Sequence, residues 1–322
     1  MGVSNSIFFR RVNAIRDEYN GRRRGTHLDR DPQTTPTRYA RSFIINGSKM
    51  RYPLPLNADE EKSWLEDLQH YLARHLWQNN FSSPIENLLR RGARVLDLGC
   101  GTTTWSFEMA KDYPKSKFSV VDFAPIPTNK HVKNIEFFQH NHGDLPFEDN
   151  TFDLVFVRLV GLSEEEWKDV LKDSYRITSA GGWIEFMQMD SRFSNCGPHL
   201  EKWNDMVASS DSTCDKLEDL LLKRNFPNLR HEVAIVPIGS WGKKTGELLF
   251  AYMRHLLCKV KSEISQPGII DELDEIMERA DQECAQHKTY GSLHRTTRSA
   301  MSGDTSTIIS ELPYFKCHYI PL

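Results

Sequence analysis

The sequence predicts an α/β fold: a doubly wound sheet of mostly parallel strands with helices on both faces. Three observations support this prediction. Short apolar runs of the kind that form buried parallel strands recur between residues 94 and 189. Segments with helical apolar spacing alternate with these runs. Gly99 and Gly101 follow directly after the first run. In such a fold, ligands bind at the carboxyl ends of the strands.

The expected elements follow from these patterns in chain order. The strands are residues 95–98, 118–122, 135–140, 154–159, a turn and fifth strand over 180–189, and 231–238. The helices are residues 104–113, 164–177, 215–226, 248–260 and 269–287, and Ser163 with Glu166 forms a capping box for the second of them. The last strand has two candidates, residues 288–295 and 314–320, with a linker over 299–307 between them.

The stretch from Arg94 to Thr102 is the most informative motif. It is an apolar strand that runs into a glycine turn, with a helix directly afterwards. Glycine permits backbone angles and a close approach that a side chain would prevent. Backbone N–H groups at the start of the helix can then face a ligand. The next strand ends in Asp122, whose carboxylate is suited to accept ribose hydroxyls. Together these features predict a cofactor that contains a nucleoside.

The glycine spacing narrows the class of cofactor. A dinucleotide fingerprint requires G-x-G-x-x-G, and here Thr102, Thr103 and Thr104 follow Gly101. An oxidoreductase with a nicotinamide cofactor stays open but is disfavoured. The pattern Asp97-x-Gly99-x-Gly101 instead resembles motif I of class I S-adenosylmethionine-dependent methyltransferases.

Longer motifs make the resemblance specific to the fungal LaeA-type methyltransferases. They include Leu145-Pro-Phe-Glu-Asp-Asn-Thr-Phe-Asp153, Gly181-Gly-Trp-Ile-Glu-Phe186, Val121-Asp-Phe-Ala-Pro-Ile126, Trp77-Gln-Asn-Asn-Phe-Ser-Ser-Pro-Ile85 and Val236-Pro-Ile-Gly-Ser-Trp-Gly242. The resemblance covers residues 50 to 260. It implies a Rossmann-like sheet of seven strands, with an N-terminal helical lid and C-terminal helical additions. It also implies S-adenosyl-L-methionine as cofactor, and an unidentified small-molecule or protein acceptor in the control of secondary metabolism or development.

The resemblance and the motif chemistry together give a set of candidate site residues. The cofactor-binding candidates are Asp97, Gly99, Cys100, Gly101, Asp122, Phe123, Asn141, His142, Asp144 and Arg158. In this set Asn141 or Asp144 would contact the adenine. No metal site is expected.

The catalytic residue is unknown, and His142, Arg158 and Asp190 are the candidates. The positively charged sulfur activates the methyl group, so the protein mainly supplies alignment. An oxygen or nitrogen acceptor also needs a base. Arg158 could instead clamp an acidic substrate or pair with Asp153 or Glu185. We expect the acceptor between Arg158, Asp190 and residues 191–198, under a lid from residues 50–80 with the aromatic candidates Tyr52, His70, Trp77 and Phe81.

Two departures from the family pattern favour an alternative function. Thr103 occupies the place of the third glycine, and a β-branched residue resists positive φ, so the turn either keeps ordinary angles or is strained. The loops at residues 139–144 and 158–163 are also short. The alternative is a catalytically weak or inactive methyltransferase-fold regulator that acts through a protein partner.

Composition limits the remaining classes. The net charge of −3 over 322 residues argues against direct binding of nucleic acid. The 6 cysteines form no C-x-x-C pair, which indicates a reducing compartment and no zinc site. No apolar run approaches the ~20 residues of a membrane span.

Residues 1–45 are expected to form a flexible basic tail, and 46–322 the methyltransferase domain. Its core is 85–240, with helical additions at 46–84 and 245–290. The first residues, Met1-Gly-Val-Ser-Asn-Ser6, fit an N-myristoylation pattern that would give weak membrane association through Gly2. Gly21-Arg-Arg-Arg24 fits a nuclear import signal, and a solvated tail is the third interpretation. The expected location is cytoplasmic, nuclear or both.

Overall fold

The computed structural model describes residues 39–45, 48–54, 59–123, 132–141, 143–158, 164–190, 192–208, 217, 229–263, 267–300 and 315–318. Several expectations therefore lie outside the described residues: the acylation and import motifs, His142, Ser163, and the helix over 215–226 except for residue 217. The domain division also remains a prediction.

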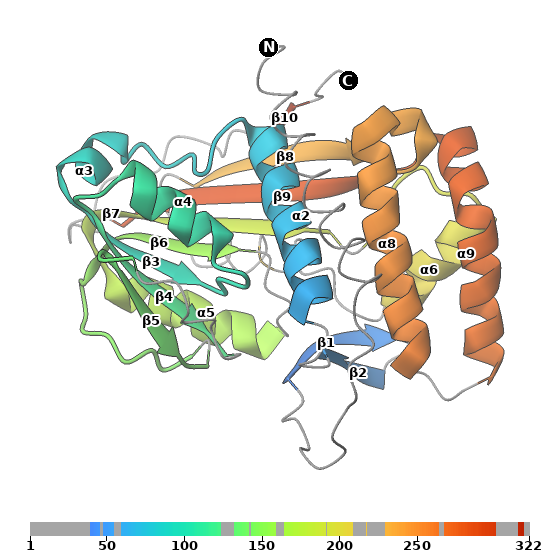
Figure 1. Ribbon diagram of the computed structural model, residues 1–322, viewed down its shortest axis with the longest axis horizontal. Coiled ribbons are helices and arrows are strands. Elements are labelled where there is room, and N and C mark those ends of the chain that lie inside the picture. The colour runs from blue at the N-terminus through green and yellow to red at the C-terminus, as the bar shows by residue number, and fades with distance from the viewer. Residues whose placement is uncertain are drawn as a thin grey trace.

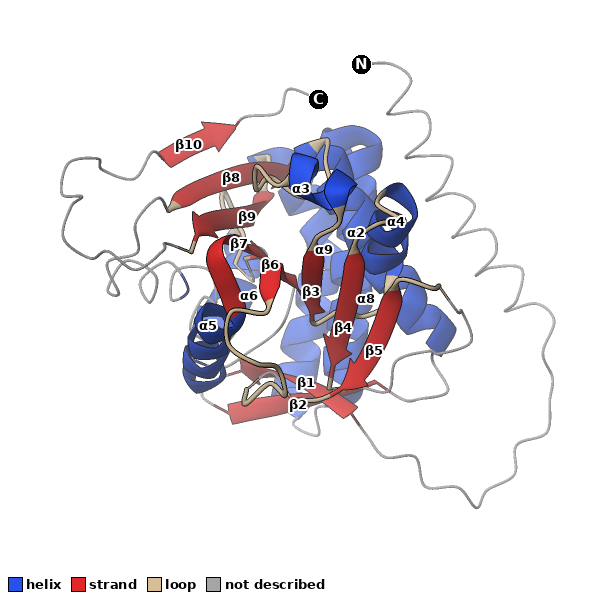
Figure 2. Ribbon diagram, turned by 90° about the vertical axis from the view of Figure 1, so that its left-hand side faces the viewer, coloured by secondary structure: helices blue, strands red, loops and turns tan. Residues whose placement is uncertain are grey.

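The main sheet has the order β10-β8-β9-β7-β6-β3-β4-β5 (Figures 1 and 2). Its parallel core is β3 (Arg94–Leu98), β4 (Lys117–Asp122), β5 (Ile135–Gln139), β6 (Phe152–Arg158) and β7 (Thr178–Met189). β9 (Tyr290–Ser299) runs antiparallel between β7 and β8 (Arg230–Pro237), so the candidate at 288–295 is the last strand of the predicted seven. The other candidate contains β10 (Phe315–His318), which adds an eighth strand parallel to β8.

Helices cover both faces of the sheet, as the sequence predicts. α5 (Glu164–Ile177) lies on one face, whereas α2 (Asp59–Trp77), α3 (Glu86–Arg91) and α4 (Thr104–Asp112) lie on the other (Figure 2). Each face has its own cluster of buried apolar side chains. α6 (Pro198–Ala208), α8 (Lys243–Glu263) and α9 (Pro267–His287) gather beyond the carboxyl ends of the parallel strands (Figure 1). The carboxyl edge of the sheet, where ligands bind in folds of this class, therefore faces a layer of helices.

The segment before α2 differs from the expected helical addition and flexible tail. β1 (Tyr39–Ile45) and β2 (Ser48–Leu54) pair antiparallel and contact α6 and α8. The two residues between these strands are Asn46 and Gly47. Asn-Gly is the pair most favourable to a tight hairpin, because both residues tolerate positive φ. The hairpin signal was therefore present in the sequence, inside a segment that we expected to be tail and helix.

The fifth strand begins earlier than expected. β7 starts at Thr178, and the Ala180-Gly-Gly turn lies within it, where the register with β6 shifts between Phe152 and Leu154. Gly181 has φ +77° and donates its N–H to Ala300 O (2.7 Å). Pairing with β9 therefore continues past the irregularity and lengthens the strand.

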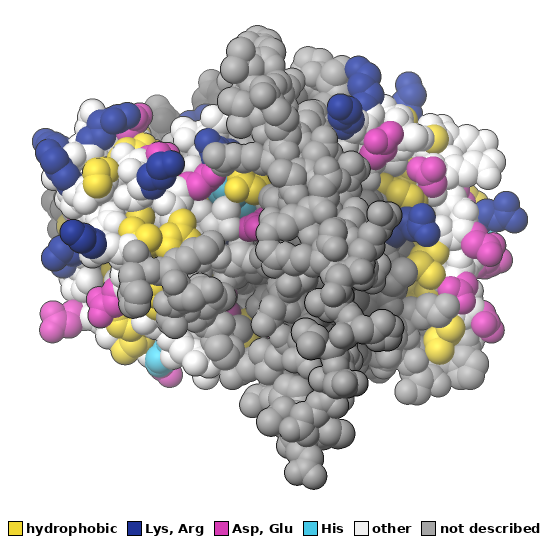
Figure 3. Space-filling view, in the orientation of Figure 1, with side chains coloured by type: hydrophobic (Ala, Val, Ile, Leu, Met, Phe, Trp, Pro, Cys, Tyr) yellow, Lys and Arg dark blue, Asp and Glu magenta, His cyan; other side chains and the backbone are white. Residues whose placement is uncertain are grey.

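The described surface in Figure 3 carries Lys and Arg side by side with Asp and Glu. None of the described helices combines the length with the apolar character that spanning a membrane requires.

Candidate functional site

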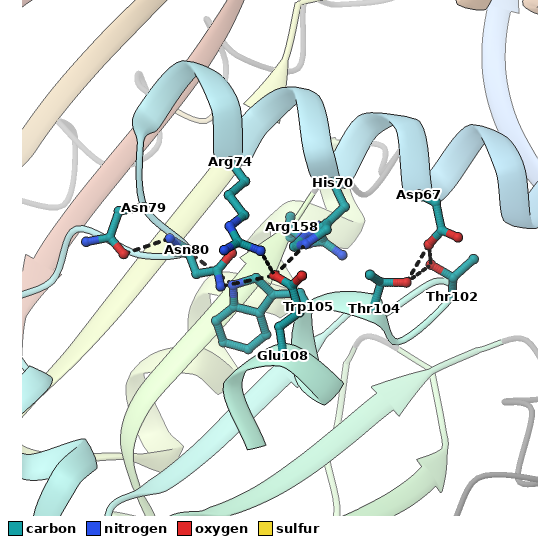
Figure 4. Close-up of polar contacts among 10 residues, drawn as sticks. All are labelled: Asp67, His70, Arg74, Asn79, Asn80, Thr102, Thr104, Trp105, Glu108 and Arg158. Atoms are coloured by element: carbon teal, nitrogen blue, oxygen red, sulfur yellow. Dashed lines mark hydrogen bonds and ion pairs between the residues drawn. The ribbon is translucent and has the colours of Figure 1, made fainter. Parts of the chain in front are cut away.

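The candidate site lies at the carboxyl ends of β3, β4 and β6, and α2 crosses over it (Figures 1 and 4). The glycine turn after β3 is tied to the end of β4. Gly99 and Gly101 have φ +79° and +54°, as their predicted role requires. Gly99 donates its N–H to Val121 O (2.9 Å), and Gly101 donates its N–H to Asp122 Oδ2 (3.0 Å). The Asp122 carboxylate is thus held against the turn.

Cys100 is a small buried side chain within the same turn. It is fully buried, and its Sγ lies 3.9 Å from Asp122 Oδ2. The sequence placed Cys100 among the cofactor-binding residues, and the structure brings it to the motif. Its side chain contributes to the apolar cluster beneath the turn.

Thr103 adopts the strained one of the two conformations considered for it. It has φ +65° and ψ +5° at the start of α4, and its side chain is buried. The left-handed region costs a residue with a Cβ roughly 1–2 kcal/mol. The Thr103 N–H donates to Cys100 O (2.9 Å), and its hydroxyl donates to Thr102 O. The turn therefore holds a β-branched residue in a left-handed conformation that it resists.

Asp97 is a buried carboxylate in the middle of the sheet face that α2 covers. Its Oδ2 accepts a hydrogen bond from Ser106 Oγ (2.5 Å), and its Oδ1 is buried without a hydrogen-bond partner. Burial raises the pKa of Asp97 to about 6, although the nearby Arg158 charge and the Ser106 hydrogen bond act in the opposite direction. A buried acceptor without a donor is costly, so Oδ1 is available to accept a hydrogen bond from a ligand.

Arg158 is joined to α4 through a histidine of α2 (Figure 4). Its Nη1 donates to His70 Nδ1 (3.0 Å), and His70 Nε2 lies 3.2 Å from Glu108 Oε2. A guanidinium only donates, so Nδ1 must accept and Nε2 must carry the proton that His70 donates to Glu108. Arg74 Nη1 (2.5 Å) and Asn80 Nδ2 (3.3 Å) also donate to the same Glu108 oxygen.

The pKa shifts in this chain of contacts agree with its hydrogen bonds. Burial lowers the pKa of His70 to about 4, so the ring is neutral at physiological pH. Burial raises the pKa of Glu108, but the His70 hydrogen bond and the Arg74 charge outweigh it, and the pKa falls to about 2. A neutral ring therefore lies between a guanidinium and a carboxylate that is charged.

The sequence placed Arg158 at the site but suggested other partners for it. Asp153 accepts the Arg94 backbone N–H (2.7 Å), and Glu185 accepts the backbone N–H groups of Ser82 and Ser83 (2.9 and 3.0 Å). Glu185 also accepts the Ser83 hydroxyl (2.8 Å). Asp153 thus bonds the backbone at the start of β3, and Glu185 bonds the backbone of the segment between α2 and α3.

α2 contributes side chains to the candidate site through contacts that the sequence did not predict. Asp67 Oδ1 accepts the hydroxyls of Thr102 (2.9 Å) and Thr104, which ties α2 to the glycine turn. His70 was expected as an aromatic lid residue and is instead a buried hydrogen-bonding group. Residues 67, 70 and 74 follow i, i+3, i+7 spacing, so they share one helix face. That polar stripe was the available signal, but only the tertiary structure shows that sheet residues face it.

The other predicted residues that the structure describes lie in the segments that follow β4, β5 and β7. Phe123 follows β4, and its carbonyl oxygen accepts from Gln139 Nε2 (3.3 Å). Asn141 and Asp144 are exposed in the loop after β5, and their adenine contact stays a prediction. Asp190 directly follows β7, and its Oδ1 accepts the Arg192 N–H (3.2 Å).

The remaining lid candidates mostly pack. Phe81 is buried in the core, and Trp77 lies against the Arg295 guanidinium at 4.2 Å from the ring centre. The side chain of Tyr52 lies outside what the structure describes.

Replacing Thr103 with glycine should stabilise the protein by about 1 kcal/mol, because glycine accepts the left-handed conformation without steric cost. Urea unfolding at pH 7.5 measures this difference. The control is Thr102→Gly, which removes a hydroxyl bonded to Asp67 from a residue outside the positive-φ set and should destabilise. A stability of Thr103→Gly at or below that of the control would contradict the strain.

Stability should depend on pH through His70. Its pKa is about 4 in the folded protein and about 6.5 in the unfolded chain, so the unfolded state binds more protons between these values. Relative to His70→Asn, wild type should lose up to about 1.4 kcal/mol per pH unit as the pH falls from 6.5 towards 5. Arg158, Arg74 and Asp97 are common to both proteins, and Glu108 stays ionised in this range. Urea unfolding curves that shift in parallel through this range would show that His70 is not buried neutral.

Comparisons with known proteins agree with this geometry. Residues 95–182 match the model of a methyltransferase domain. The chain is 27% identical over 165 residues to the protein-methionine methyltransferase laeA of Emericella nidulans, covering 46% of this chain and 44% of that protein. It is 27% identical over 218 residues to the secondary metabolism regulator laeA of Aspergillus niger, covering 61% and 55%. The chain thus spans about half the length of the curated relatives that it matches.

Among solved structures, a phosphoethanolamine N-methyltransferase of Haemonchus contortus in complex with S-adenosyl-L-methionine matches 79% of this chain and 62% of its own, with 14% identity and a TM-score of 0.44. The matched methyltransferase domain begins in β3 and ends in β7, so it contains the glycine turn, Asp122 and Arg158. Residues 95–182 thus form a methyltransferase domain within a sheet of the order described above, and the chain is similar to the laeA proteins over part of its length.

Proposed function

We propose that this protein binds S-adenosyl-L-methionine at the carboxyl ends of β3, β4 and β6 and transfers its methyl group to an acceptor beside β6 and β7. The observation that carries the proposal is the buried Oδ1 of Asp97, an acceptor without a hydrogen-bond partner beside the Arg158 charge. An acceptor and a guanidinium at one place suit a ligand end with both an ammonium and a carboxylate, which is what the amino-acid part of this cofactor offers.

The residues present fit the rest of the cofactor. The positive-φ glycines carry no side chains that would block a ligand at the turn, and we propose that Asp122, held by the Gly101 N–H, accepts the ribose hydroxyls. When bound, the cofactor supplies an activated methyl group on a positively charged sulfur. The protein's part is to hold that methyl group in line with the acceptor and to exclude water.

On the acceptor side, the start of α6 is held from α9. The segment after β7 leads into α6, whose first N–H groups are capped from α9: Glu283 accepts the N–H groups of His199 (3.1 Å) and Leu200 (3.1 Å). Glu283 also accepts from His199 Nδ1 (2.6 Å). We propose that the start of α6, Asp190 and the carboxyl end of β6 form the boundary of the acceptor site.

The first acceptor class to test is a protein methionine. The Emericella nidulans relative is named a protein-methionine methyltransferase. A thioether has no proton to remove, so its methylation depends on positioning alone. We further propose that the protein acts in the control of secondary metabolism, as the name of the Aspergillus niger relative states for that protein.

A second candidate function is regulation through a protein partner with weak or no turnover. The strained Thr103 favours this regulatory function, because it is a β-branched residue at the place where the cofactor-binding motif of the family has glycine. Titration of the full chain with S-adenosylmethionine, S-adenosylhomocysteine and NAD, followed by assay of S-adenosylhomocysteine formation with methionine-containing peptides and a small-molecule panel, separates the candidates. Binding without turnover supports regulation, whereas binding of NAD alone would overturn the methyltransferase.

Asp122→Ala should weaken S-adenosylhomocysteine binding by about 1.5–3 kcal/mol, because it removes the charged acceptor expected to bind the ribose. Calorimetric titration of the folded variant measures this change. Asp112→Ala, at the exposed end of α4, is the matched control and should bind like wild type. Equal affinities for wild type and Asp122→Ala would remove Asp122 from the cofactor site.

A further inference from the structure

α2 contacts the site at three successive turns. Asp67 bonds the two threonine hydroxyls beside the glycine turn, His70 bonds Arg158 at the end of β6, and Arg74 bonds Glu108 on α4 (Figure 4). α2 lies outside the segment that matches the methyltransferase domain, which begins at residue 95. A helix from outside that domain thus supplies a direct partner of a site residue.

His70 can hold Arg158 in only one way. Its Nδ1 accepts from the guanidinium, so its Nε2–H must donate, and Glu108 Oε2 is the acceptor. Arg74 and Asn80 hold that Glu108 oxygen in turn. The ring is 2% exposed, and T-shaped contact with Tyr71 at 5.0 Å further limits its orientation. The ring can therefore neither flip nor swing without breaking both hydrogen bonds.

Arg158 is the group whose direction this arrangement decides. It ends β6 and is 7% exposed, and its charge acts on Asp97. A long side chain at a strand end has several rotamers, and a fixed acceptor selects among them. A guanidinium carries its N–H donors in a fixed planar fork, so the bond from Nη1 to His70 also sets the direction of the other donors.

We propose that His70 is a positioning residue: it holds the Arg158 guanidinium against the carboxylate of the cofactor's amino-acid part, while Asp97 Oδ1 receives the ammonium. The inference rests on the proposed function and adds to it a residue of α2 and a means of discrimination. A ligand with the amino-acid part should depend on His70, and a ligand that carries only the thioadenosine part should not.

Two substitutions separate the two hydrogen bonds of His70. In His70→Asn the side-chain oxygen lies near the position of Nδ1 and can still accept from Arg158. In His70→Gln the amide lies near the position of Nε2, so the bond to Glu108 can persist while the bond to Arg158 is lost. Both variants are polar and smaller than or similar to histidine, so their general cost to folding is matched. His75→Gln, the same change five residues along α2, is the control for the helix itself.

The experiment is calorimetric titration of the full chain and its variants with S-adenosylhomocysteine and with 5′-methylthioadenosine. We expect His70→Gln to bind S-adenosylhomocysteine about tenfold more weakly than wild type, and 5′-methylthioadenosine within twofold of it. His70→Asn and His75→Gln should stay within about threefold of wild type for both ligands. In an Arg158→Gln background, adding His70→Gln should produce no further loss, because the two residues then act through one contact.

The results distinguish the possible failures. Equal weakening of both ligands by His70→Gln would make His70 a structural residue and overturn the proposal. Unchanged affinity of His70→Gln for S-adenosylhomocysteine would overturn it also, and would leave Arg158 to an anionic acceptor. A wild-type protein that binds neither ligand would refute the proposed function itself, since that result does not depend on any variant.

Discussion

The candidate site is organised around one interaction, the hydrogen bond from the buried Arg158 guanidinium to His70. A cation removed from water costs several kcal/mol unless charges and hydrogen bonds compensate it. Three elements contribute to this compensation: Asp97 on β3 acts through its charge, His70 on α2 accepts a hydrogen bond, and Glu108 on α4 acts through His70. The helices α2 and α4 and the strands β3 and β6 must therefore assemble together for the charge to be tolerated. Stability and the geometry of the ligand site depend on the same contacts.

This dependence explains why α2 belongs to the site rather than to its surroundings. Its apolar side chains Leu68, Leu72 and Leu76 are buried in the core, while Asp67, His70 and Arg74 bond the turn, β6 and α4. Gln69 Nε2 also donates to the Tyr252 hydroxyl on α8. α2 thus joins the sheet that would hold the cofactor to the C-terminal helices beyond its edge. Displacement of α2 would break contacts to both at once.

The glycine turn shows how tertiary structure overrides a local preference. Thr103 keeps a left-handed conformation because the Gly99 and Gly101 N–H groups, held by Val121 O and Asp122, fix the path of the chain on one side. Trp105, stacked on Phe156 at 4.4 Å and bonded to Asn80 O, fixes α4 on the other. Strain of about 1–2 kcal/mol persists where surrounding contacts determine the backbone, and ligand-binding turns are common places for it.

The sequence by itself determined the doubly wound sheet, because apolar runs of strand length alternating with helical spacing have few other solutions. It also predicted that the glycine turn after β3 and Asp122 at the end of β4 lie together, since neighbouring parallel strands end at the same edge of a sheet. It did not determine the hairpin β1–β2, whose Asn46-Gly47 signal was outweighed by expectations for the flank, or the choice between two last strands. Above all, it could not show that His70 bonds Arg158, 88 residues away, because a polar stripe on a helix looks the same whether it faces water or a buried guanidinium. Only the packing of α2 on the sheet decides which of these it faces, since that packing removes water and leaves each polar group to find its partner.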